Sequence, residues 1–440
     1  MREMKDSGIS WVGEIPKEWN KRPIRSIIKS RVGGVWGDDI NDDIQGVVCI
    51  RIADFDFSKR KIKDVSSDLL TYRLYNSIQI QKYSLQKNDI LIEKSGGGEK
   101  TPVGRAVLFD KNYKALFANF MDRIRIDDSI VLPLFAEYWL WNLYSCRVTP
   151  YYINQTIGIQ NIDLTFMLVK EKICFPSLVE QQRIAEFLDR ECGKIDGLKA
   201  DIQAQIDTLE QYKRSVITEA VTHGLNPSAP MKDSKVWYGQ IPSEWKELKG
   251  KYVFKQSNDR GNNVCLQLLS PTQKYGVIPQ DKYEELTGMN AVKLNGSTNY
   301  ALLKTIHKGD YCISLRSFQG GFEYSEYEGV VSPAYQVFYP IITIADGYYK
   351  YLFKEKSFID VMNSYTMSLR DGKNIAFDDF GDTFIPVPPL DEQQEIADYL
   401  DNKCAEIEQI IADKKTQIET LDGYKKSLIY EYVTGKKEVV

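Results

Sequence analysis

The sequence predicts a mixed α/β protein in four parts, with two unlike globular domains alternating with two similar long helices. The segment "LVEQQRIAEFLDRECGKI", which begins at Leu178, returns as "LDEQQEIADYLDNKCAEI" from Leu390, an offset of 212 residues. Likewise "GEIPKEW" near the start returns as "GQIPSEW" from Gly239. A repeat this long indicates one duplicated two-part module, not a solenoid. The predicted boundaries are 1–176 and 225–388 for the globular domains, and 177–224 and 389–440 for the helices.

Both repeated segments carry apolar residues at alternating steps of three and four, which is typical of a coiled-coil seam. We expect the two helices to pair antiparallel within the chain, which gives an internal pseudo-two-fold repeat. Because Lys403 and Lys414 also fall on the seam, the alternative is that each helix only packs against its own domain. The predicted seam is Ile184, Leu188, Ile195, Leu198, Ile202, Leu209, Tyr212 and Val216, with Ile396, Leu400, Ile407, Ile410, Leu421, Tyr424 and Leu428.

The two globular domains share the same order of predicted elements but little sequence. Each has a strand leading to a glycine-containing turn, then further β-type segments, then an aromatic helix, predicted at 135–144 and 348–362. Each ends in a polar loop, 151–164 and 363–377, before a short run into proline. Two modules with one architecture and different polar residues suit the same task performed on different targets.

Composition places the chain among ordinary soluble proteins, with 43% hydrophobic and 27% charged residues. Its seven cysteines are scattered, which favours free thiols in a reducing compartment, and we expect a cytoplasmic protein. Net charge is +4 for 1–176 and 0 for 225–388, but −3 and −5 for the two helical segments. A surface that binds nucleic acid should therefore lie on the globular domains.

No catalytic pattern stands out in the sequence. The glycine-rich stretch "SGGGEKTPVGR" fails as a phosphate loop, because Glu99 precedes Lys100 and a strand-like segment follows. The two histidines, His223 and His307, are far apart, which disfavours a histidine-based metal or nucleophile site. The Asp/Asn-Pro-Pro-aromatic motif of amino-methyltransferases is also missing.

The duplicated "EQQxIAxxLDxxCxxI" helix, the "GxIPxEW" entry and the two divergent domains resemble the DNA specificity (S) subunit of type I restriction-modification systems. The resemblance covers essentially the whole chain. It implies a non-catalytic, sequence-specific DNA-binding subunit in which each domain is a target recognition domain that reads one half of a split, asymmetric DNA site. It further implies that the helices set the spacing and dock two methyltransferase subunits, with restriction subunits added in the full enzyme. S-adenosylmethionine, ATP and Mg²⁺ would be bound by those partners. The alternative is a coiled-coil interaction scaffold without sequence-specific DNA binding.

Base edges and phosphates are contacted by cationic, amide, hydroxyl and aromatic side chains. In the first domain the candidates for DNA binding are Lys94, Arg105, Arg123, Arg125, Tyr152, Asn154, Gln155, Thr156, Gln160 and Asn161. In the second they are Arg316, Ser317, Gln319, Tyr335, Ser364, Tyr365, Ser368, Arg370, Lys373 and Asn374. Candidates for the partner interface are Glu180, Gln181, Gln182, Glu392, Gln393 and Gln394.

Overall fold

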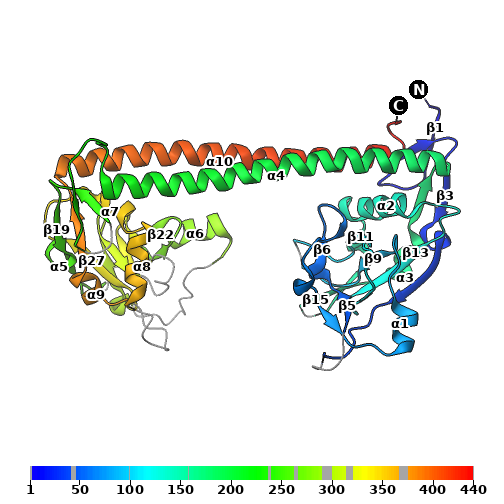
Figure 1. Ribbon diagram of the computed structural model, residues 1–440, viewed down its shortest axis with the longest axis horizontal. Coiled ribbons are helices and arrows are strands. Elements are labelled where there is room, and N and C mark those ends of the chain that lie inside the picture. Colours follow the sequence, from blue (N-terminus) through cyan, green and yellow to red (C-terminus); the bar gives the residue numbers. More distant parts are fainter. Residues whose placement is uncertain are drawn as a thin grey trace. The chain divides into compact units, whose positions relative to one another are not determined.

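The chain forms two compact units, each built from one globular domain and part of both long helices (Figure 1). Unit 1 comprises residues 1–204 and 414–440, and unit 2 comprises 205–413. The long helices are α4 (Leu178–His223) and α10 (Leu390–Val433). The computed structural model describes residues 2–40, 46–98, 100–156, 158–235, 239–261, 266–289, 300–313, 321–365 and 375–439, without the side chains of Gln155, Thr156 and Tyr300.

The globular part of unit 1 is a mixed sheet covered by helices. Its largest described sheet has the strand order β4-β13-β9-β11-β7-β6, with β13 between β4 and β9 and paired antiparallel to both. The strands are β1 (Met4–Asp6), β2 (Glu14–Pro16), β3 (Asn20–Pro23), β4 (Ile28–Gly33), β5 (Val47–Ile50), β6 (Phe55–Asp56), β7 (Lys61–Ile62), β8 (Tyr72–Arg73), β9 (Ile90–Glu93), β10 (Ser95–Gly96), β11 (Ala106–Leu108), β12 (Ala115–Phe117), β13 (Met121–Ile126), β14 (Ile153–Thr156), β15 (Ile159–Ile162) and β16 (Lys172–Phe175). The helices are α1 (Ser77–Tyr83), α2 (Pro133–Ser145) and α3 (Leu164–Lys170).

Unit 2 repeats this plan with shorter strands around a core rich in aromatic rings. Its largest described sheet has the order β20-β27-β24-β25 and is antiparallel throughout. The strands are β17 (Met231–Asp233), β18 (Gln240–Pro242), β19 (Lys246–Lys249), β20 (Phe254–Gln256), β21 (Leu269–Thr272), β22 (Gly276–Pro279), β23 (Lys304–Ile306), β24 (Tyr311–Ile313), β25 (Phe322–Tyr324), β26 (Gly329–Val331), β27 (Gln336–Pro340) and β28 (Phe384–Val387). The helices are α5 (Gly250–Val253), α6 (Gln280–Thr287), α7 (Asp346–Leu352), α8 (Lys356–Ser364) and α9 (Phe377–Asp382).

The aromatic helix predicted at 348–362 is two helices, α7 and α8, with a short turn between them. The Glu355 carboxylate accepts a hydrogen bond from the Phe358 backbone N–H at 2.9 Å and so caps the start of α8. Since an N-cap side chain satisfies a backbone donor that the first turn leaves unpaired, Glu355 begins a new helix where the apolar pattern alone predicts a continuous one. In unit 1 the prediction at 135–144 is confirmed by α2.

The two long helices pair antiparallel within each unit, as predicted. In unit 1, Lys425 Nζ lies 2.6 Å from Asp196 Oδ1, and Lys199 pairs with Asp422, so residue numbers rise along one helix and fall along the other. In unit 2, Lys213 pairs with Glu408, at the positions that correspond to Lys425 and Asp196 after the 212-residue offset. The same interhelical ion pair therefore occurs in both copies of the repeat.

The seam of the helix pair differs from the predicted one at two positions in each helix, where the inward residue is the next one along the chain. Leu198 and Tyr212 are exposed, and so are their counterparts Ile410 and Tyr424. Counted by burial, both helices keep a three-four spacing, but lysines occupy some of the inward positions because carboxylates on the facing helix pair with them. The inward positions are Cys192, Ile195, Lys199, Ile202, Ile206, Leu209, Lys213 and Val216, with Cys404, Ile407, Ile411, Lys414, Ile418, Leu421, Lys425 and Leu428.

The repeated "IPxEW" segment receives the end of a long helix in both units. Gly224 follows α4 and Gly435 follows α10, with positive φ angles of 74° and 71° that end each helix in the left-handed conformation. A Cβ on Gly224 would lie 3.2 Å from the Trp245 ring, and one on Gly435 would lie 3.1 Å from the Trp19 ring. Both tryptophans are fully buried. The motif therefore forms the platform on which each helix terminates.

The cores of the globular domains continue into the helices. In unit 1, Ile184 and Leu188 of α4 and Ile429 of α10 belong to the same buried cluster as Trp139. In unit 2, Ile396 and Leu400 of α10 complete the aromatic cluster. Each helix is thus held by its own domain as well as by the other helix, so both interpretations of the apolar face hold at once.

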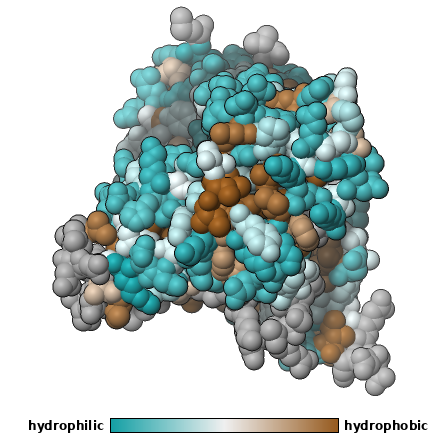
Figure 2. Space-filling view, turned by 90° about the vertical axis from the view of Figure 1, so that its left-hand side faces the viewer, coloured by the Kyte–Doolittle hydropathy of each residue, from teal (hydrophilic) through white to brown (hydrophobic). Residues whose placement is uncertain are grey.

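The surfaces of the two units do not repeat. Figure 2 shows apolar residues gathered near the middle of one face of unit 2. Exposed large apolar side chains at the β19–α5 end of this unit are Tyr252, Ile341 and Ile342. The backbone N–H groups of Ile341 and Asp127 bond to the equivalent Val253 and Ile27 carbonyls, so the corresponding positions of unit 1 hold Ser26, Asp127 and Asp128. The duplication therefore preserves the frame and not the outer residues.

Candidate nucleic-acid interface

The polar loop predicted at 151–164 in the first domain is a β-hairpin, β14–β15, extended by β10 into a three-stranded sheet within the described residues. Asn154 and Asn161 are exposed, and the Ser95 hydroxyl donates to Asn161 Oδ1 at 2.6 Å. Gln155 and Thr156 lie in β14, and their side chains fall outside the described part of the chain. The hairpin therefore presents amide side chains next to the strand end that carries Lys94 and Ser95.

Two other hairpin candidates face inward. Gln160 is 6% exposed, and its Oε1 accepts a hydrogen bond from the Val103 backbone N–H at 3.3 Å. The Tyr152 hydroxyl donates to Glu171, and burial together with that carboxylate raises the pKa of the phenol. These side chains hold the hairpin against the domain, so we correct their expected role from DNA contact to support of the hairpin.

Three predicted DNA-binding arginines are bonded to groups of the first domain itself. Arg105 makes two hydrogen bonds, of 2.9 and 3.0 Å, to the buried Glu93. Arg125 makes the same kind of contact with the buried Asp89, at 2.7 and 2.8 Å, which raises the arginine's pKa. Arg123 is 6% exposed, and burial lowers its pKa. The expected cationic face of β13 is wrong, because Arg123 is buried and donates to the Ser84 carbonyl, and Arg125 is paired with Asp89.

Lys94 is partly exposed and has a neighbour, Arg31, that the sequence analysis did not single out. Its ammonium lies 3.0 Å from Asp122 Oδ1, and Arg31 Nε donates to Asp122 Oδ2 at 2.7 Å. Arg31 also donates from Nη1 to Thr165 Oγ1 at 3.0 Å. The signal that could have found Arg31 was the pair of glycines after it, Gly33 and Gly34, which mark close approach of the strand end to other groups.

In the second domain the structure describes three of the predicted residues. Tyr335 is half-buried, and its carbonyl accepts from Lys304 Nζ at 2.8 Å. Ser364 lies in the last turn of α8, and its hydroxyl donates to the Val361 carbonyl. The Tyr365 hydroxyl is 3.1 Å from that of Thr383, and its side chain is 42% exposed. The remaining candidates lie outside the described residues: Arg316, Ser317, Gln319, Ser368, Arg370, Lys373 and Asn374.

At the N-terminal ends of α4 and α10, one repeated glutamine of each helix is buried against the globular domain. Gln181 Oε1 accepts from the Leu132 backbone N–H at 2.8 Å, and its amide nitrogen donates to the Pro176 and Ile130 carbonyls. Gln393 repeats this with the Ala345 N–H at 3.0 Å and the Pro388 carbonyl at 2.9 Å. Both glutamines are almost completely buried, so they fasten each domain to its helix instead of forming the expected partner surface.

The acidic residues beside them differ between the units. Glu180 pairs with Arg2, whereas Glu392 accepts from the Trp245 indole N–H at 2.8 Å. Gln182 and Gln394 are exposed and bond to carboxylates one turn later on their own helices. Of the predicted partner interface, these two exposed glutamines keep a position that a partner could reach.

We expect Gln181→Leu to destabilise the chain far more than Gln182→Leu. The first change leaves the Leu132 N–H and two carbonyls without partners, and each buried unsatisfied group costs about 1–3 kcal/mol. The second removes one exposed bond within a helix and should cost less than about 0.5 kcal/mol. Denaturant midpoints of the two variants measure the difference, and equal midpoints would contradict the fastening role.

Within the described residues, no group of three or more histidine, cysteine, aspartate or glutamate side chains is arranged to hold a metal ion. No helix in that part of the chain has the length and apolarity needed to cross a membrane. An open hollow of about 460 Å³ in unit 1 is lined by Trp11, Tyr151 and Lys172 among others.

The duplicated frame of two unlike domains and two paired helices defines a scaffold that presents two different surfaces. The family model of the type I restriction modification DNA specificity domain matches residues 16–208 and 242–420, so the chain belongs to this family of specificity proteins. Members of the family are non-catalytic subunits that recognise specific DNA sequences.

Individual relatives agree with the family over nearly the whole chain. A Methanocaldococcus jannaschii protein named "Putative type I restriction enzyme MjaX specificity subunit" is 22% identical, covering 97% of this chain and 96% of the relative. The MjaVIII specificity subunit of the same organism is 25% identical over 68% of this chain and 70% of its own. A solved structure concerned with complex assembly and conformational transition of the type I R-M system has the same fold, with a TM-score of 0.67 at 14% identity, over 96% of this chain and 99% of that one.

Proposed function

We propose that each globular domain reads one half of a bipartite, asymmetric DNA site and that the paired helices set the distance between the halves. This proposal rests on one contrast: the buried residues that join each domain to its helix are repeated in the two units, whereas the surface residues are not. The buried fastenings Gln181 and Gln393 and the platforms Trp19 and Trp245 recur. The polar residues predicted to contact DNA do not recur between the two domains. Because the readers differ, the half-sites should differ; because the frame is shared, the unread gap should have constant length.

We further propose that two copies of a methyltransferase subunit dock on the helices, at two equivalent apolar patches. The first patch is Leu198 with Tyr424, in unit 1; the second is Tyr212 with Ile410, in unit 2. All four side chains are between 38% and 58% exposed and lie one residue before an inward position of the seam. Apolar side chains kept at equivalent exposed positions of both copies favour one partner bound twice. Restriction subunits, S-adenosylmethionine, ATP and Mg²⁺ would enter with the partners.

Sequencing of methylated bases across a genome tests the reading function. The chain would be expressed with its methyltransferase subunits in a host that lacks other adenine methylation. We expect a split, asymmetric methylated motif with a gap of constant length, and we expect the motif to disappear when this chain is omitted. Methylation that depends on the chain but follows no such motif would favour a scaffold without sequence-specific DNA binding.

We expect Asn161→Ala to relax recognition of one half of that motif and leave the other half intact. Asn161 is exposed on β15 of unit 1, and a lost base contact typically removes about 1–3 kcal/mol of discrimination at one position. The same methylation mapping measures this, because each half of the motif is scored separately. Simultaneous relaxation of both halves would show that the domains do not read independently.

A further inference from the structure

We propose that Arg31 and Lys94 together bind one phosphate of the DNA in the first half-site, and that Asp122 positions both cations for it. This inference rests on the proposed DNA-reading function and names a contact within it. Asp122 takes the role of a positioning residue, because it acts through the two cations and does not itself touch the DNA.

The charge balance of this cluster differs from that of the Arg105 and Arg125 contacts in the same domain. Arg105 with Glu93, and Arg125 with Asp89, are each one cation on one buried carboxylate. At Asp122 two cations share one carboxylate that is 5% exposed, which leaves a net charge of +1. Excess positive charge held at a fixed point is what a phosphate contact requires.

Both cations keep an outward part. Their side chains are 24% and 33% exposed, for Arg31 and Lys94 respectively. The contact of Lys94 with Asp122 is an ion pair without hydrogen-bond geometry, since Asp122 Oδ1 has no hydrogen-bond partner among the described residues. The ammonium is therefore attracted to the carboxylate but keeps its donors available to a second anion.

The backbone is shaped to admit the lysine. A Cβ on Gly33 would lie 3.0 Å from Lys94 Nζ and 3.3 Å from Asp122 Oδ1, so the absence of a side chain makes room for the ammonium to reach the carboxylate. Gly33 pairs with Asp122 across the β4–β13 ladder, which places both directly beside each other. The cluster is thus built by strand register, not by chance contact of long side chains.

The surroundings suit a DNA backbone. Ser95, next to Lys94, donates to Asn161 of the reading hairpin, and Thr165 holds the other end of Arg31. Phe120 is 47% exposed, and its carbonyl accepts from the Lys94 and Ser95 backbone N–H groups. A phosphate bound here would therefore fix the position of the strand next to the exposed amides, as phosphate contacts fix register for base contacts.

The sign of the effect of Asp122→Asn separates positioning from bulk charge. If only net charge mattered, removing this carboxylate would tighten DNA binding. If positioning matters, binding weakens although a negative charge has gone, and we expect the dissociation constant for DNA to rise about tenfold. Asp382→Asn is the matched control, because Asp382 of unit 2 also pairs with two lysines, Lys249 and Lys251. It should leave the first half-site unchanged.

The experiment uses the chain assembled with its methyltransferase subunits and duplex DNA that carries the mapped site. Fluorescence anisotropy gives dissociation constants at several salt concentrations, for this duplex and for one with the first half-site scrambled. For Lys94→Met we expect the slope of log affinity against log salt to fall by about 1, with base preferences unchanged. Circular dichroism melts check that each variant is folded.

Three results would overturn the inference: tighter or equal binding by a folded Asp122→Asn variant, an unchanged salt slope for Lys94→Met, or a change in base preference equal to the change in affinity. Lys94→Met keeps the Arg31–Asp122 bond and so tests the idea even where Asp122→Asn does not fold. If the parent complex itself does not distinguish the mapped site from the scrambled one, the proposed function fails instead.

Discussion

A chain with both Leu198→Glu and Tyr424→Glu is expected to bind one methyltransferase subunit instead of two. The two side chains are exposed, and the ion pairs Asp196–Lys425 and Lys199–Asp422 put them at the same level of the helix pair in unit 1. A charge at the centre of an apolar contact loses its burial and faces desolvation. Losses of about 2–4 kcal/mol are typical of central interface residues and weaken binding about 30- to 1,000-fold.

The equivalent change in unit 2, Tyr212→Glu with Ile410→Glu, should remove the other subunit, and all four changes together should remove both. Native mass spectrometry of the purified complexes counts the subunits directly. Gln417→Glu is the control, because it adds a negative charge at an exposed position of α10 in unit 1, outside the patch. If the four-fold variant retains two methyltransferase subunits, the partner docks elsewhere on the chain.

These patches also show why sequence patterns predicted the helices well and their faces less well. Leu198 and Tyr212 fit a three-four apolar pattern as readily as Lys199 and Lys213, and an apolar residue is the better guess for a buried seam. The choice between the two registers depends on partners across the seam, such as Asp422 for Lys199 and Glu408 for Lys213. Contacts between residues some 200 positions apart are invisible to a local pattern.

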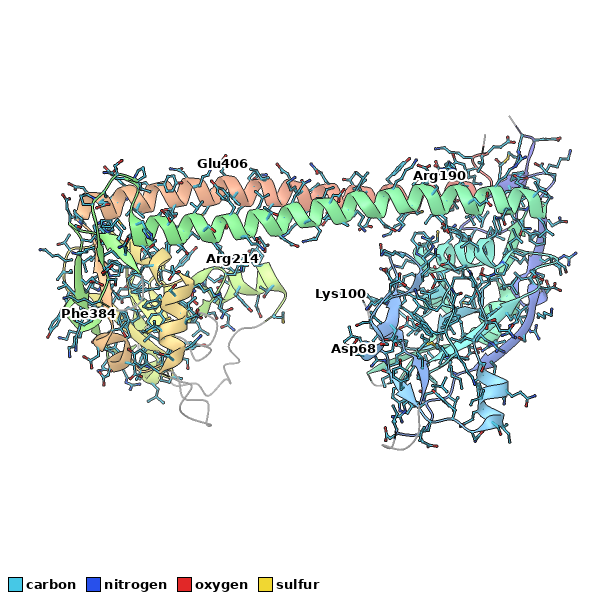
Figure 3. The ribbon with its side chains drawn as sticks, in the orientation of Figure 1. Asp68, Lys100, Arg190, Arg214, Phe384 and Glu406 are labelled. Atoms are coloured by element: carbon cyan, nitrogen blue, oxygen red, sulfur yellow. The ribbon has the colours of Figure 1, made fainter. Side chains whose placement is uncertain are left out.

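Part of the outer face of the helices could be predicted from polarity. Figure 3 shows Arg214 on α4 and Glu406 on α10, both in unit 2, with side chains pointing away from the seam. Both are well exposed, at 74% and 59%. Such residues need no partner to be satisfied, so their position follows from polarity.

The candidate DNA surface was predicted in part for a related reason. Asn154 and Asn161 are exposed and Lys94 is partly exposed, since they lie at strand ends and hairpin positions, and their contact with DNA stays a prediction. Arg105 and Arg125 have the right chemistry for DNA but bond to buried carboxylates that precede them by 12 and 36 residues, at no regular spacing. The sequence alone does not distinguish an arginine that neutralises a buried carboxylate from one that is free to bind a phosphate. The fold is needed to tell them apart.

Asp196→Ala is expected to destabilise unit 1 by about 3–5 kcal/mol, because it leaves a buried ammonium without its counter-ion. The Lys425 side chain is 5% exposed, and its ammonium lies 2.6 and 2.7 Å from the two oxygens of Asp196. It also donates to the Ser58 carbonyl at 2.7 Å, so the pair ties the first domain to both helices. Hydrogen exchange in the described segments of unit 1 reports the loss locally.

The repeat supplies its own control. Glu408→Ala removes the corresponding carboxylate in unit 2, where Lys213 is 26% and Glu408 is 65% exposed. Water can hydrate that lysine, so the cost should stay below about 1 kcal/mol. The double change Asp196→Leu with Lys425→Met, which removes both charges, should recover most of the stability lost in Asp196→Ala, because an apolar pair of similar size avoids the unpaired charge. Equal costs for Asp196→Ala and Glu408→Ala would show that burial of Lys425 does not set the strength of this contact.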